Sequence, residues 1–88
     1  MMWRYFIHFD ECGEAYELFR FPANGKDLLD QDDCDVYKCL KGGVWSGDEK
    51  MYLMVQSIGG HFNEAQSEIS EAEALRLIEK WSAASWPT

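Results

Sequence analysis

Residues 2–21 decide the fold, and they read MWRYFIHFDECGEAYELFRF. Large apolar side chains alternate over residues 2–9 and again over residues 14–21, which is the period-two pattern of β-strands. Gly13 lies between the two runs and can adopt the left-handed conformation that a short hairpin turn requires. We therefore expect a β-hairpin that ends at Pro22, because proline cannot extend a paired strand. In the first strand Trp3, Tyr5, Ile7 and Phe9 would share one face, and Arg4, Phe6 and His8 the other.

The C-terminal region carries the clearest helix signal. Ser70 and Glu73 have the spacing of a capping box, in which the hydroxyl and the carboxylate each bind a free backbone N–H group. Ile69 precedes the cap, at the position of a hydrophobic staple, and the helix should end before Pro87. The expected apolar stripe, which would face the core, consists of Ala74, Leu75, Ile78 and Trp81.

Residues 36–40 are compatible with a short helix or with a strand. A helix there would be stopped by Gly42-Gly43. The short length and the Val-Tyr content favour a third strand, which would turn at the two glycines into Val44-Trp45.

Residues 48–58 favour a second helix, with Asp48 as its N-cap and Gly59 at its C-terminal end. Residues 51–55 are also compatible with a buried strand, since periodicity alone does not settle so short a run. The spacing i, i+3, i+4, i+7 that favours the helix is formed by Met51, Met54, Val55 and Ile58.

These elements predict one α+β domain spanning residues 1–88. A small antiparallel sheet, made of the N-terminal hairpin and one or two further short strands, would be packed by the C-terminal helix and by a second helix. A chain of 88 residues with 47% hydrophobic residues is long enough for one core and too short for two.

The charge of the chain excludes several function classes. The formal net charge is −8, and the 8 basic residues form no run. Direct binding to nucleic acid or to an anionic membrane is therefore not expected, since both require a basic surface. The odd number of cysteines, 3, favours a reducing cytoplasm over a disulfide-bonded secreted domain. The start of the chain has no apolar core of a signal peptide.

An acidic segment is the most unusual feature of the sequence. It is not an EF-hand calcium loop, because Asp35 stands where the turn glycine belongs and Lys41 where the twelfth ligand belongs. One hypothesis is a surface that imitates the charge of nucleic acid, extended by Glu11, Glu14 and Glu17 of the hairpin. The alternative is a solvated loop that only keeps the domain soluble. The segment contains Asp27, Asp30, Asp32, Asp33 and Asp35.

Metal-binding and enzymatic functions receive little support. A zinc site or a Cys–His nucleophile pair would have to be assembled from His8, His61, Cys12, Cys34 and Cys39, which show no ligand spacing such as Cys-x-x-Cys. Neither glycine pair is followed by the Lys-Ser/Thr of a phosphate loop. We expect no enzymatic activity, no metal and no cofactor.

The predicted function is that of a non-enzymatic interaction module that binds a protein partner with a basic surface. The five aspartates would form the charged footprint, and Phe21 and Trp86 would be aromatic anchors. A specific form is an inhibitor that occupies the nucleic-acid groove of a basic protein, by analogy with phage-encoded anti-CRISPR proteins that mimic DNA. The alternatives are a small Cys/His metal-binding or enzymatic domain and a homo-oligomeric structural subunit, such as a homodimer.

Overall fold

The computed structural model describes residues 2–40, 44–60 and 62–84. Within them lies a five-stranded sheet in the order β4-β3-β2-β1-β5, in which every neighbouring pair is antiparallel. This confirms the predicted α+β class with its N-terminal hairpin. The strands are β1 (Trp3–Phe9), β2 (Ala15–Pro22), β3 (Tyr37–Leu40), β4 (Trp45–Ser46) and β5 (Glu68–Ile69).

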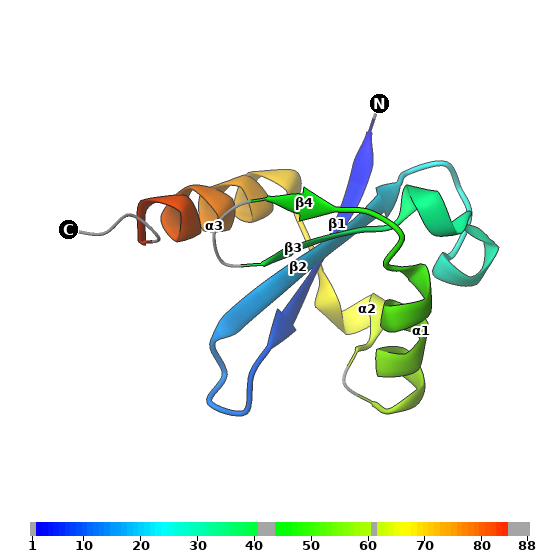
Figure 1. Ribbon diagram of the computed structural model, residues 1–88, viewed down its shortest axis with the longest axis horizontal. Helices are drawn as coiled ribbons and strands as arrows, with labels where there is room; N and C mark the ends of the chain where they lie inside the picture. Colours follow the sequence, from blue (N-terminus) through cyan, green and yellow to red (C-terminus); the bar gives the residue numbers. More distant parts are fainter. Residues whose placement is uncertain (1, 41–43, 61, 85–88) are drawn as a thin grey trace.

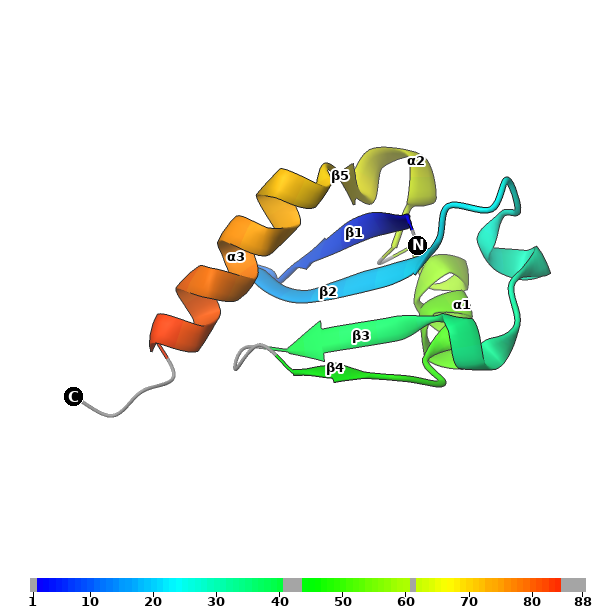
Figure 2. The same cartoon turned by 90° about the horizontal axis from the view of Figure 1, so that it is seen from above.

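Helices lie on both sides of this sheet. Figure 1 shows α3 on one side and α1 and α2 on the other, and Figure 2 shows the strands from above. Two single-turn 3₁₀ helices, η1 and η2, lie in the connection between β2 and β3. The helices are η1 (Leu28–Asp30), η2 (Asp33–Asp35), α1 (Lys50–Ile58), α2 (Glu64–Ser67) and α3 (Glu71–Ala84).

The β1–β2 hairpin forms as the sequence predicts. Gly13 has a φ of 84°, and its amide donates to the carbonyl of Asp10. The Asp10 carboxylate also accepts hydrogen bonds from the amides of Cys12 and Glu14, which fixes the turn. Pro22 is the last residue of β2, as expected.

The sheet separates two hydrophobic clusters, one on each face. The cluster under α3 is formed by Tyr5, Ile7, Leu18, Cys39, Ala74 and Trp81. The cluster on the opposite face is formed by Phe6, Phe19, Phe21, Leu28, Val36, Leu53 and Phe62. Since both faces are covered, hairpin rings are buried on both sides: Tyr5 on one face, and Phe6, Phe19 and Phe21 on the other. Phe21 is fully buried and stacks on Phe6 with ring centroids 4.8 Å apart.

The burial of Phe21 corrects one prediction. An aromatic anchor must reach a partner, and a ring with 0% exposure has no surface to offer. The alternation of residues in the hairpin does not show whether this ring is exposed, because it does not show what covers the second face of the sheet. The elements that cover it are α1, α2 and the 3₁₀ segment.

The capping box of α3 is confirmed. The Ser70 hydroxyl accepts a hydrogen bond from the Glu73 amide at 3.1 Å, and the Glu73 carboxylate accepts one from the Ser70 amide at 3.4 Å. The apolar stripe differs from the predicted one at a single position. Leu75 is exposed, whereas Leu77 packs against the cluster with Ile78.

Helix α1 is also confirmed, but two of its details differ from the prediction. Asp48 is not the N-cap: its φ of 63° lies in the left-handed region, and Glu49 occupies the cap position without a side-chain bond. The helix ends at Ile58 with Gly59 as its C-cap, as expected, and Gly60 follows with a φ of 81°. The second difference, the direction of the apolar stripe, creates the site described below.

Candidate functional site

The acidic segment is an ordered piece of structure. Leu28 and Val36 are buried and anchor it in the cluster on the α1 side of the sheet. Gln31 is buried between them, and its amide nitrogen donates to Asn24 Oδ1 and to the carbonyl of Lys26, both at 2.9 Å. A solvated tail would have no such anchors, so the fold holds the backbone that carries the carboxylates.

Lys50 joins this segment to α1. Its ammonium group donates hydrogen bonds to the carbonyl of Leu29, at 3.0 Å, and to the carbonyl of Gln31. Because the lysine binds backbone oxygens, its charge is held near the segment without an ion pair to any aspartate side chain. The acidic segment and the first turn of α1 therefore form one unit.

The aspartate side chains of the segment face solvent. Four of the five are exposed and Asp35 is partly buried. Among the described residues, none of the five forms an ion pair. The exposed ones are Asp27, Asp30, Asp32 and Asp33. Like charges kept close by a rigid backbone repel one another, and a basic partner would relieve that repulsion.

α1 contacts both 3₁₀ helices of the acidic segment, and it carries an exposed apolar stripe. Met51, Val55 and Ile58 are 64%, 58% and 86% exposed, respectively, and their spacing places them on one side of the helix. Leu53, on the opposite side, is fully buried against the sheet. The sequence predicts the helix from these three residues and Met54, but it does not show that the three face outward while Met54 packs against the core.

Leu29 continues the apolar surface from α1 into the acidic segment. Its side chain is exposed, and it shares a shallow hollow of about 230 Å³ with Ile58. The other residues lining that hollow are Leu28, Met54, Ser57 and Glu64. We call the surface formed by Leu29, Met51, Val55, Ile58 and the five aspartates the acidic–apolar surface.

The other predicted site residues do not join this surface. Trp86 lies outside the described residues. Glu17 is buried against His8, so of the three hairpin glutamates only Glu11 and Glu14 are exposed. The proposed extension of the acidic surface onto the hairpin therefore loses Glu17.

The Cys and His residues do not assemble into a site within the described part of the chain. No group of three His, Cys, Asp or Glu side chains there could hold a metal ion. His8 Nδ1 lies 2.7 Å from Glu17 Oε1, but both side chains are only 2% exposed and out of reach of a substrate. Burial raises the pKa of the Cys39 thiol, with a smaller opposing effect of the Arg20 charge, so this cysteine is a poor nucleophile. Cys12 and Cys34 are exposed, and His61 lies outside the described residues.

Comparisons with known proteins find no counterpart. No protein-family model, curated protein or solved structure matches this chain.

None of the helices in the described residues is long and apolar enough to cross a membrane.

Proposed function

We propose that this chain is a non-enzymatic protein-interaction module that binds a basic surface of a partner protein through the acidic–apolar surface. The observation that carries the proposal is the outward-facing stripe Met51, Val55 and Ile58 beside aspartates without ion pairs. A contiguous exposed apolar patch with a polar rim is typical of protein interfaces.

The two parts of the surface have different roles in the proposed mechanism. The aspartates attract a basic partner over several ångströms, so they accelerate encounter and set the orientation of the complex. The apolar side chains lose contact with water only when the complex is formed, so they slow dissociation. Leu29 lies between the aspartates and the apolar stripe of α1, so it would also contact the partner.

A second copy of this chain is a poor occupant of the surface. A symmetric dimer through α1 would bring two acidic segments into proximity, since an isologous interface uses the same patch twice. The resulting like-charge contact opposes association. The proposal is therefore a heterologous partner with lysine or arginine side chains around an apolar centre.

The inhibitor hypothesis is a narrower form of this proposal. If the partner binds nucleic acid through its basic surface, the aspartates would compete with phosphate groups for the same cations. The narrower form requires that a duplex and this chain exclude each other from the partner, which a competition assay measures directly.

Affinity capture with purified, tagged variants tests the proposal. A partner that the wild-type chain captures should be retained at least tenfold less by the triple variant D30K/D32K/D33K. The single variant Val55→Asp should reduce its retention by a similar factor. The triple variant E11K/E71K/E79K changes the net charge by the same amount at exposed positions outside the surface and should retain the partner. Circular dichroism should show all variants folded.

Salt dependence adds an independent measurement. Retention should fall as the ionic strength rises, since exposed charges are screened beyond about 8 Å at physiological salt. A partner that binds D30K/D32K/D33K as tightly as wild type, or one that is lost equally from E11K/E71K/E79K, would contradict the proposed surface.

A further inference from the structure

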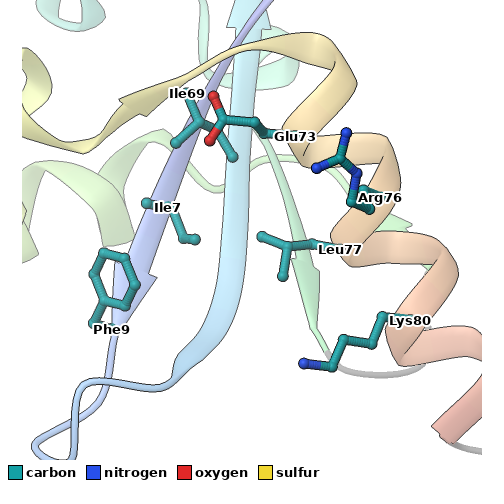
Figure 3. Close-up of a pocket in the computed structure, with 7 residues that line it drawn as sticks. All are labelled: Ile7, Phe9, Ile69, Glu73, Arg76, Leu77 and Lys80. Atoms are coloured by element: carbon teal, nitrogen blue, oxygen red, sulfur yellow. The ribbon is translucent and has the colours of Figure 1, made fainter.

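A second hollow lies on the other face of the molecule, between β1 and α3. Its volume is about 390 Å³, within the range of small-ligand sites. Apolar side chains from the strands and from the helix line it: Ile7, Phe9, Ile69 and Leu77. Figure 3 shows them together with Glu73, Arg76 and Lys80 of α3, which complete the lining.

The sheet topology explains why this space stays open. β5 pairs with β1 only at Tyr5 and Phe6, so the outer edge of β1 from Ile7 to Phe9 has no strand partner among the described residues. Phe9 is 58% exposed at the end of that edge. The helix that follows β5 passes over the face of the sheet and leaves the hollow between itself and the end of β1 (Figure 3).

Four basic residues elsewhere in the described chain have other partners, whereas the side chain of Lys26 is exposed without one and lies outside the hollow. Arg4 binds Glu68, and Lys38 pairs with Glu49. Lys50 is engaged by backbone carbonyls, as described above. The Arg20 guanidinium lies between two indole rings, 4.4 Å from the centroid of Trp3 and 4.2 Å from that of Trp45.

Arg76 and Lys80 differ from these four residues. Neither side chain forms an ion pair or a hydrogen bond with a described residue, although the chain has twice as many acidic as basic residues. Glu73, the acidic residue of the lining, is already engaged by Ser70 in the capping box. Two like charges four residues apart destabilise a helix slightly, and an anion bound between them would remove that repulsion.

We propose that this hollow binds a small amphipathic anion, an aliphatic carboxylate of medium chain length. The hydrocarbon chain would lie on Ile7, Ile69 and Leu77, and the carboxylate would accept hydrogen bonds from Arg76 and Lys80. In Figure 3 the Leu77 and Lys80 side chains both extend from the helix toward the strands, so one ligand can contact the apolar and the cationic part.

A free small molecule fits the site better than an added peptide strand. The unpaired part of the β1 edge spans only residues 7–9, which is at the short limit of an ordinary strand. The volume of the hollow is at the lower end of ligand pockets, which limits the ligand to a chain of medium length. The proposal does not depend on the acidic–apolar surface, because no residue of that surface lines this hollow.

Titration with decanoate, followed by methyl NMR, tests the proposal. Saturable shifts are expected at the methyl groups of Ile7, Ile69 and Leu77 below the micellar concentration of the ligand. Decyltrimethylammonium has the same chain with the opposite charge and should bind at least tenfold more weakly. Equal binding of the two compounds, or no saturable shift with decanoate, would overturn the proposal.

Substitution of the two cationic residues tests where the carboxylate of decanoate binds. Arg76→Gln combined with Lys80→Gln should weaken decanoate binding at least tenfold, and both positions are exposed, so the fold should be retained. Lys26→Gln removes an exposed cation outside the hollow and should leave binding unchanged. Unchanged affinity in the double variant would contradict the assignment. If a peptide binds instead of decanoate and shifts the backbone amides of residues 7–9, the small-ligand proposal is overturned. The edge of β1 would then bind an added strand.

Discussion

Helices α1 and α3 cover opposite faces of the same sheet, yet they use their apolar side chains in opposite ways. α3 buries Ala74 and Trp81 and packs Leu77 and Ile78 against them. α1 buries only Leu53 fully and leaves its main apolar stripe in water. The comparison shows that periodicity predicts a helix without predicting which side of it meets the core.

The difference follows from what each sheet face already carries. The face under α1 holds the rings of Phe6, Phe19 and Phe21, and connecting segments add Leu28 and Val36. Little space remains for α1 to fill, so one leucine with partly buried Met54 is enough. The opposite face lacks such connecting segments and is closed by the length of α3.

The largest expected effect compares the two helices directly. Trp81→Ala should lower the free energy of unfolding by about 3–5 kcal/mol, because it removes a buried indole and leaves a cavity. Ile58→Ala, at the most exposed large apolar side chain of α1, should change it by less than about 0.5 kcal/mol. Urea denaturation followed by circular dichroism measures both values. Similar losses in the two variants would mean that the α1 stripe is packed in solution.

The next effect concerns the buried polar pair on the α1 side of the sheet. Glu17→Leu should cost about 1–3 kcal/mol, because it leaves His8 buried with neither ring nitrogen bonded; Nε2 has no partner even in the wild type. Replacing both residues, His8→Phe with Glu17→Leu, should cost less than the sum of the single changes. Denaturation of the four chains of this double-mutant cycle gives the coupling. Additive losses would show that the two side chains do not interact.

The smallest effect concerns the ion pair that ties α2 and β5 to β1. The hydrogen bond from Arg4 holds the pKa of the Glu68 carboxyl below its usual value, and the Arg4 charge acts in the same direction. A depressed folded-state pKa stabilises the fold above the unfolded value, about 4.3, and this stabilisation is lost as the pH falls through the folded-state pKa. Because both side chains are partly exposed, its size should be below about 1 kcal/mol.

Stability curves against pH test this pair. The difference in unfolding free energy between wild type and Glu68→Gln should be present at pH 6 and vanish toward pH 3. Glu79→Gln removes an exposed carboxylate of α3 that forms no ion pair within the described part of the chain, and this variant serves as the control. A Glu68→Gln difference that persists at pH 3 would assign the effect to packing instead of charge.

Much of the fold could be predicted because its signals are local. The hairpin follows from alternation and Gly13, and α3 follows from the capping box of Ser70 and Glu73. The additional elements α2 and β5 could not be predicted. α2 is a single turn capped by Asn63, and β5 pairs with a strand about 60 residues away. Short elements carry too few residues for periodicity to be visible.

The candidate site was predicted only in part, for the same reason. The aspartates are visible as a run of charge, and large rings without an obvious cover, such as Phe21 and Trp86, favour an interface. Burial of Phe21 shows that the cover exists. The exposed stripe of α1 was visible in the sequence, where its spacing is the same as that of a core-facing helix.

The sequence by itself determined the hairpin, the class of the fold, the position of the two longer helices and the acidic character of residues 27–35. Each of these features depends on side chains that lie close together in the sequence. Only the tertiary structure decided that Phe21 is core, that Met51, Val55 and Ile58 face water, and that Arg76 and Lys80 border a hollow. Those properties depend on which distant surfaces compete to cover the same sheet face, and no local pattern encodes that competition.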